Sequence, residues 1–154
     1  MKARTMLVTL ALCFVGLTCF AADDPQMGTW KLNEGKSKIA AGSPKNNTVV
    51  YAADGDNVKV TVDGTDADGK SIHNEWTGKF DGKDYAVTGD PSQDTRSYTR
   101  VNDHSLAMTA KKDGKVMTSG RIVVAPDGKS RTVTTTRSDA KGKKSRSSAV
   151  YDKS

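Results

Sequence analysis

The residues best suited to binding chemistry are Arg96, Tyr98 and Arg100, which alternate along one short segment. Alternate side chains of an extended strand point to the same face, so these three would share one side of a sheet. Two guanidinium groups and a phenol can bind a carboxylate or a phosphate through charge-assisted hydrogen bonds. If that face points outward, the same residues form a solvated surface with cross-strand partners instead. Both interpretations stay open on the sequence alone.

Other chemistry-bearing residues are better explained without a metal or a reaction. Acidic residues in segment 64–75 are spaced partly as in a calcium loop, but glycine occupies the first ligand position. We therefore expect a hairpin turn in which Asp66 and Asp68 bind backbone amides. His73 and His104 have no cysteine near them, which favours no metal site. With two glutamates and no Gly-x-Ser-x-Gly motif, we expect a non-enzymatic protein without a cofactor.

Basic residues are concentrated at the C-terminal end of the chain. Residues 129–154 contain eight Lys or Arg and two Asp, whereas residues 22–128 contain 14 basic and 16 acidic residues. The last two strands would then form a basic ribbon that could bind an anionic envelope polymer or a membrane surface. A nucleic acid partner is not expected, because only Tyr151 offers a stacking ring there. The alternative is a charged edge that resists aggregation.

The N-terminal residues 1–21 have the features of a signal peptide: a basic start, an apolar run over 7–20 and small residues before the expected cleavage site. Residues 22–154 would then form one domain, exported to the periplasm or the extracellular space. Both cysteines belong to the leader, so we expect this domain to fold without a disulfide. Only 39 of its 133 residues are apolar, which predicts a small core.

The elements that must position these residues are short strands. Asp-Gly pairs recur six times between segments of alternating polarity, and this combination is typical of β-hairpins. No amphipathic helix fits between them. The sequence therefore predicts an all-β fold, in which an antiparallel up-and-down meander closes into a barrel and so removes exposed edges. The ten predicted strands cover 28–33, 47–53, 57–63, 70–80, 83–88, 94–101, 104–111, 115–125, 129–138 and 143–151.

Alternation within these segments indicates which side chains share a face. Val116, Ile122 and Val124, for example, have one parity and are expected on the same side of their strand. A ten-strand barrel is wider than its side chains can fill, so part of the inner wall could be Thr and Ser facing water or a ligand. Thr and Ser on the outer faces are the alternative.

The segment Gly28-Thr29-Trp30-Lys31-Leu32 resembles the G-x-W signature of lipocalins and the opening strand of fatty-acid-binding proteins. With Lys36-Ser37-Lys38 and the threonine-rich segment 132–136, the chain is similar to short exported bacterial lipocalin-like proteins of the calycin type. This resemblance implies a barrel that binds a small, partly hydrophobic or amphipathic ligand.

The resemblance also implies structural roles for two residues of the motif. Gly28 allows the chain to turn as it enters the barrel, and Trp30 closes one end. In lipocalins an arginine from a late strand covers this tryptophan, and a cation–π contact would explain it. The candidates here are Arg121, Arg131 and Arg146. Unlike fatty-acid-binding proteins, the chain has a loop over 34–46 in place of two helices.

Overall fold

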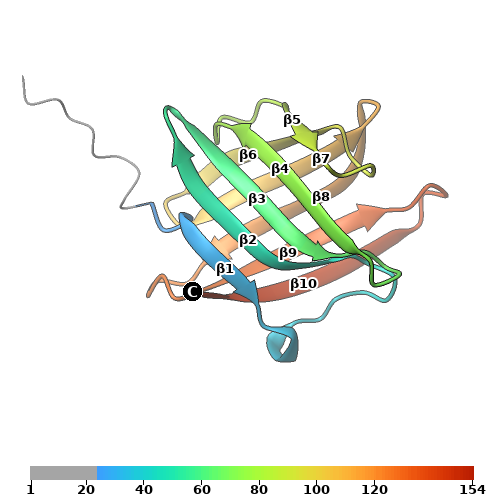
Figure 1. Ribbon diagram of the computed structural model, residues 1–154, viewed down its shortest axis with the longest axis horizontal. Helices are drawn as coiled ribbons and strands as arrows, with labels where there is room; N and C mark the ends of the chain where they lie inside the picture. The colour runs from blue at the N-terminus through green and yellow to red at the C-terminus, as the bar shows by residue number, and fades with distance from the viewer. Residues whose placement is uncertain (1–23) are drawn as a thin grey trace, which may run out of the picture.

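Ten antiparallel strands follow one another around a closed barrel, and β1 pairs with β10 to complete it (Figure 1). The computed structural model describes residues 24–154, so the predicted signal peptide, residues 1–21, lies outside the described residues. The predicted ten-strand meander is confirmed, with strand ends within two residues of expectation. The strands are β1 (Gly28–Leu32), β2 (Lys45–Asp54), β3 (Asn57–Thr65), β4 (Ser71–Gly78), β5 (Tyr85–Thr88), β6 (Thr95–Asn102), β7 (Ser105–Lys112), β8 (Lys115–Val124), β9 (Ser130–Ser138) and β10 (Lys144–Lys153).

The Asp-Gly pairs make the tight turns that the sequence predicts. Between β7 and β8 the turn consists of Asp113 and Gly114, with φ of 49° and 73°, and Lys112 pairs with Lys115 across it. Positive φ at both central residues suits the right-handed twist of the flanking strands. Gly55 and Gly69 also have positive φ, 57° and 80°, in other turns of the barrel.

One predicted face is wrong, because a β-bulge interrupts β8. Ala110 pairs with Thr118, but the next residue of β7, Lys111, pairs with Val116. Met117 is therefore an extra residue on β8 that has no partner on β7. As a result, Val116 is 47% exposed while Ile122 is buried, although both were expected on the same face. Met117, which has the opposite parity, reaches the barrel interior instead.

The core is built around two groups of aromatic side chains. Trp76 packs against Tyr98, with ring centroids 4.8 Å apart, and stacks with Phe80 at 6.5 Å. Its indole N–H donates to the carbonyl of Arg96 at 2.8 Å, which links β4 to β6 behind the short strand β5. The second group surrounds Trp30, which is fully buried.

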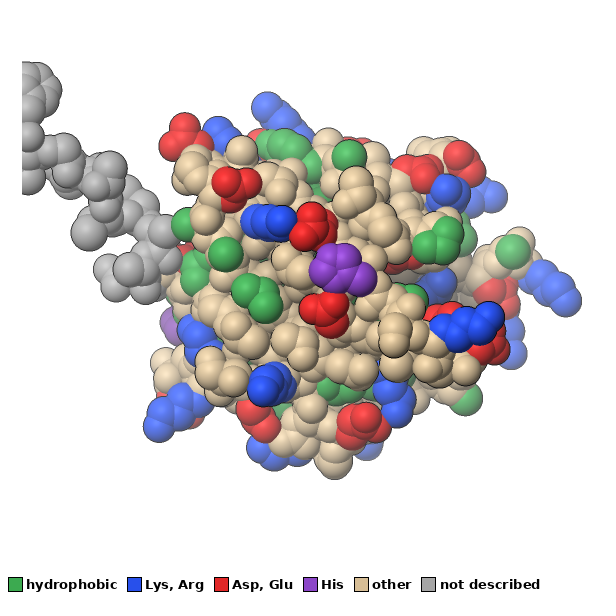
Figure 2. Space-filling view, viewed as in Figure 1, with side chains coloured by type: hydrophobic (Ala, Val, Ile, Leu, Met, Phe, Trp, Pro, Cys, Tyr) green, Lys and Arg blue, Asp and Glu red, His purple; other side chains and the backbone are tan. Residues whose placement is uncertain are grey.

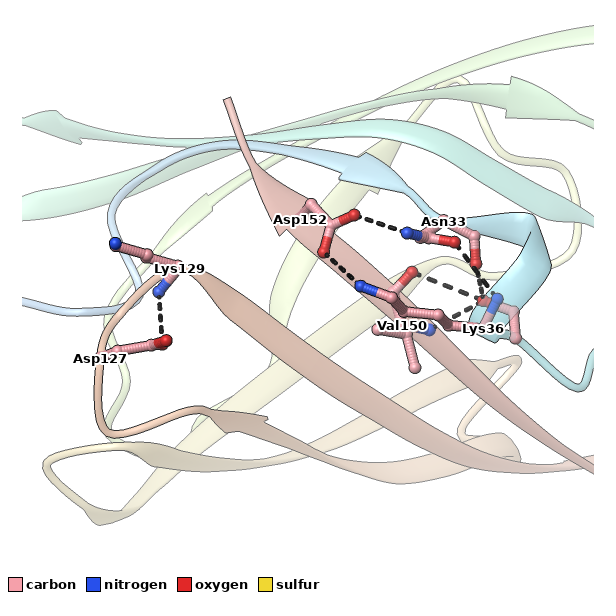
Figure 3. A network of polar contacts seen from close by, with 7 residues as sticks. Asn33, Lys36, Asp127, Lys129, Val150 and Asp152 are labelled. Carbon is pink, nitrogen blue, oxygen red and sulfur yellow. Dashed lines mark hydrogen bonds and ion pairs between the residues drawn. The ribbon is translucent and has the colours of Figure 1, made fainter.

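The connection from β1 to β2 is fastened to β10 (Figure 3). It begins with a single 3-10 turn, η1 (Glu34–Lys36), and continues as an irregular segment, in agreement with the predicted loop. The Asn33 amide donates to the Asp152 carboxylate at 2.6 Å, and the Lys36 ammonium lies 3.6 Å from the same group. Within residues 24–154, no helix has the length and apolar character needed to cross a membrane.

Candidate functional site

The barrel interior contains a cavity of about 170 Å³. A water molecule needs about 10–15 Å³ of such space, so the cavity accommodates on the order of ten water-sized groups. Ile39 and Pro44 of the β1–β2 connection and Ser92 of the β5–β6 loop contribute to its wall near one end of the barrel. Deeper apolar lining comes from Val49, Val62, Ile122 and Val133.

The strand register explains why space is left here. Arg96 pairs with Ala110, Ala110 with Thr118, and Thr118 with Arg137, so these four form one continuous inward row across β6–β9. Two small side chains therefore separate two arginines. In the next row, Gly120 lies between Met108 and Thr135 and adds no side chain at all. Of these small residues, Ala110 and Thr118 line the cavity, and they leave volume that larger side chains would fill. Gly120 does not line it, and a Cβ there would lie 2.5 Å from the Thr134 carbonyl oxygen.

Arg96 is the principal charged group of the cavity wall. Its side chain is 6% exposed, and it donates to the Gln93 amide oxygen at 3.1 Å, to the Asn74 amide oxygen at 3.2 Å and to the Tyr98 hydroxyl at 3.4 Å. All three acceptors are neutral. A buried guanidinium without a carboxylate partner is unfavourable by several kcal/mol before these hydrogen bonds offset it, so its position marks a candidate site.

The β5–β6 loop positions Arg96 through an aspartate that does not touch it. Asp90 accepts hydrogen bonds from the Ser92 N–H and hydroxyl, and also from the Gln93 amide that contacts Arg96. Burial acts to raise the pKa of Asp90, but these hydrogen bonds and the Arg96 charge outweigh it, and the net pKa is lowered. The negative charge of Asp90 is therefore stabilised by hydrogen bonds from residues of the same loop.

Three tyrosines line the middle of the cavity: Tyr51, Tyr98 and Tyr151. Tyr51 and Tyr98 make an edge-to-face contact, with centroids 6.2 Å apart. Burial, reinforced by Tyr98, raises the pKa of Tyr51, and burial raises the pKa of Tyr151 to about 12. Tyr51 and Tyr151 are therefore neutral near pH 7, and each of the three phenol groups can donate one hydrogen bond and accept others.

Gly28 and Trp30, for which the sequence predicts structural roles, lie on β1, the strand that closes the barrel against β10. Gly28 has a φ of 112°, and Trp30 is fully buried with its indole N–H donating to the carbonyl of Gln26 at 2.9 Å. Of the three candidate arginines, Arg131 covers the ring, with 4.7 Å from the guanidinium carbon to the ring centroid. Lys153 lies over the same ring at 5.1 Å.

The three sequence-predicted ligand residues separate into two groups. Arg96 and Tyr98 line the cavity and contact each other, as their shared parity allowed. Arg100 lies outside the cavity, where it pairs with Asp24 and its guanidinium carbon is 5.1 Å from the Phe80 ring centroid. Arg100 has the same strand parity as Arg96 and Tyr98, but its guanidinium forms an ion pair with Asp24 of the N-terminal segment.

Sequence reasoning missed three residues of the site: Asn74, Gln93 and Arg137. Arg137 has the same parity as the buried Arg131 on β9, a pattern that could have placed it inside. For the two amides no signal exists, because an Asn or Gln looks the same in sequence whether it orients a buried arginine or faces water.

The other candidate sites are ordinary surface structure. The Asp66 carboxylate accepts from the backbone N–H groups of Asp68 and Lys70, as predicted for this turn, whereas the Asp68 side chain accepts no backbone hydrogen bond among the described residues. His73 is exposed on the outer face, 2.6 Å from Asp63 and 3.8 Å from Glu75. Over the described part of the chain, no group of three or more His, Cys, Asp or Glu residues is arranged to hold a metal ion.

The basic residues of the predicted ribbon lie on both sides of the barrel wall, some inside the barrel and some outside it. Arg131 is buried and Arg137 lines the cavity, so neither belongs to an outer basic face. The exposed basic residues concentrate around the β9–β10 turn, where they are Lys141, Lys143, Lys144 and Arg146. On the face shown in Figure 2, acidic and basic side chains are interspersed.

No protein-family model and no curated protein sequence matches this chain. Among solved structures, the chain is similar to a redesigned β-barrel, mFAP1, bound to DFHBI, with 14% sequence identity and a TM-score of 0.45. That match covers 84% of this chain and 95% of the other. The ten-strand closed register described above defines the fold by itself.

Proposed function

We propose that this is an exported, non-enzymatic, lipocalin-like protein that binds a small, partly hydrophobic ligand inside its barrel. The observation that carries the proposal is the cavity of about 170 Å³, whose wall combines aliphatic side chains with buried hydrogen-bonding groups. Such a wall suits a ligand with an apolar body and a few polar atoms. The first 21 residues, which have the composition of a signal peptide, support export.

The direct test is to express the full chain, purify the exported protein and measure its mass under native and denaturing conditions. We expect a mature chain that begins at Ala22 and a co-purified small molecule, or binding of an added neutral probe such as 2-naphthylmethanol. An uncleaved chain would contradict export. A barrel that neither retains a molecule nor binds any small apolar probe would contradict ligand binding.

A matched pair of variants places binding inside the barrel. Ala110 lines the cavity, whereas Ala107 is three residues away on β7 and pairs with Arg121 on the outer face. Ala110→Phe should fill part of the cavity and lower probe affinity at least tenfold, because little free volume would remain. Ala107→Phe adds the same ring outside and should leave binding unchanged. Equal effects of the two variants would place the probe elsewhere.

The exposed basic residues of the β9–β10 turn support a second candidate function, binding of an anionic envelope polymer or membrane surface. Lys141, Lys143, Lys144 and Arg146 lie within six positions, with Asp139 nearby. Such a cluster attracts polyanions in a salt-dependent manner. Binding to vesicles of anionic lipid that disappears at high salt and in a Lys→Gln variant of this turn would support it, and no vesicle binding at low salt would exclude it.

A further inference from the structure

The cavity wall has an excess of positive charge. It includes three arginines, Arg96, Arg131 and Arg137, and one carboxylate, Asp90. Among the described residues, no acidic side chain lies within ion-pair distance of any of the three arginines. Asp90 is bound by its own turn and by Gln93. Within a low-dielectric interior, this arrangement favours an anion over a neutral molecule or a cation.

Arg96 has hydrogen-bonding capacity to spare. A guanidinium has five N–H donors, and three are used by Gln93, Tyr98 and Asn74. The other two N–H groups have no acceptor among residues 24–154. Because the Tyr98 hydroxyl accepts from Arg96, its own proton is left to donate. Arg96 and Tyr98 both line the cavity, so β6 can supply up to three donors there, a number that suits the two oxygens of a carboxylate.

Resting on the proposed function, we propose that the ligand is a compact organic carboxylate whose acid group binds Arg96 and Tyr98. Its apolar body lies over the small-residue wall formed by Ala110 and Thr118 and reaches toward the deeper aliphatic lining. Arg137, at the far end of the same inward row, adds a second positive charge, and it forms no ion pair with an acidic residue of the described part of the chain. The cavity volume limits the body to about one or two rings.

Arg131 is a poorer site for the acid group, although it also lines the cavity. Its guanidinium carbon lies 4.7 Å from the Trp30 and Tyr51 ring centroids and 5.2 Å from that of Tyr151. Three aromatic faces already stabilise its charge. Its Nε and Nη1 atoms are buried without partners, but the surrounding rings restrict approach.

The test compares three naphthalene probes of similar shape on the exported full-length product: 2-naphthoate, the neutral 2-naphthylmethanol and 2-naphthyl phosphate. Titration calorimetry at pH 7 should show 2-naphthoate binding at least tenfold more tightly than the alcohol. Arg96→Gln should remove most of that advantage and change the affinity for the alcohol less than twofold. Arg121→Gln is the control, because Arg121 is exposed on the outer face and its loss changes the net charge equally.

The outcomes separate this proposal from the proposed function. If the alcohol binds and the carboxylate binds no better, the barrel has a ligand site but the anion assignment is wrong. If Arg96→Gln lowers the affinity for 2-naphthoate and for the alcohol equally, Arg96 maintains the structure of the cavity wall and does not bind the acid group. Preferential binding of 2-naphthyl phosphate would show that the ligand is a phosphate ester and would overturn its assignment as a carboxylate. If none of the probes binds, the proposed function itself fails.

Arg137→Gln provides a second test that does not depend on a fully buried residue. Arg137 is only partly buried, so its replacement should leave the fold intact. We expect the affinity for 2-naphthoate to fall about two- to threefold and the affinity for the alcohol to stay unchanged, since the Arg137 charge acts on the carboxylate at longer range. An unchanged affinity for 2-naphthoate would remove Arg137 from the site. If Arg96→Gln does not fold, the three-probe comparison on the unaltered protein still decides the anion preference.

Discussion

The Arg131 guanidinium lies over the Trp30 indole, with 4.7 Å between the guanidinium carbon and the ring centroid. These residues belong to β9 and β1, which are separated in the barrel by β10. The same guanidinium also contacts Tyr51 on β2 and Tyr151 on β10. A single cation therefore joins four strands at the place where the barrel closes, and it does so without a carboxylate partner.

Arg131→Met should lower the free energy of unfolding by about 1–3 kcal/mol, because contacts with three aromatic faces are lost while the aliphatic packing is largely kept. Urea denaturation measures the change. Arg121→Met on the outer face should stay within about 0.5 kcal/mol of the unaltered protein. If Arg131→Met were as stable as the unaltered protein, the free-energy cost of burying the Arg131 charge would equal the stabilisation that its contacts with the aromatic rings provide.

Gly89→Ala should destabilise the protein more than Gly114→Ala. Both glycines have positive φ, 83° and 73°, and an alanine there costs about 1–2 kcal/mol. A Cβ at Gly89 would also lie 2.3 Å from the carbonyl oxygen of His73, whereas at Gly114 it would meet open space. Denaturant midpoints of the two variants should therefore differ clearly. Equal midpoints would show that the β5–β6 loop moves to accommodate the methyl group.

The strands were predictable because their signals are local. Asp-Gly turns and alternating polarity act over a few residues, and each agrees with the barrel as a whole. The bulge at Met117 was not predictable, because one extra residue leaves the period of two intact on each side and changes only the register. The exposed Val116 is its direct consequence.

The candidate site was predictable in part for the same reason. Parity placed Arg96 and Tyr98 on one face, but only the closed register decides that this face is the interior. The choice of Arg131 over the other candidate arginines also depends on which strands meet at the closure. Asn74 and Gln93 contribute through side-chain geometry alone, and no sequence period encodes that.

The pKa of His73 should be higher than its usual value. Its hydrogen bond to Asp63, aided by the Asp63 and Glu75 charges, raises its pKa against a smaller opposing effect of burial. Any contribution to stability is therefore present below the unfolded value of about 6.5 and is lost as the pH rises through the folded pKa. Because the group is exposed, we expect a visible shift by NMR titration rather than a change in denaturation.

Two substitutions make the histidine titration specific. Asp63→Asn should lower the pKa of His73 toward its usual value, since the bond at 2.6 Å is the main cause. Glu75→Gln should have a smaller effect, because that carboxylate is 3.8 Å away. A His73 pKa that is unchanged by Asp63→Asn would contradict the contact.

Alkaline pH should unfold the protein through its buried tyrosines. Burial raises the pKa of Tyr151 to about 12, and burial also raises that of Tyr51. The unfolded chain loses these protons near pH 10, before the folded one does, so their contribution is complete below pH 10 and falls as the pH rises. For Tyr151 the loss by pH 12 is on the order of 2 kcal/mol.

Absorbance at 295 nm during an alkaline titration distinguishes the two states. In the folded protein, the Tyr51 and Tyr151 phenols should remain protonated at pH 11, and their ionisation should coincide with loss of the near-ultraviolet circular dichroism signal. Tyr151→Phe should reduce the fall in stability between pH 10 and pH 12, because the unfolded chain then has one fewer phenol to ionise. A Tyr151 phenol that ionises near pH 10 while the barrel stays folded would show that it is accessible to water.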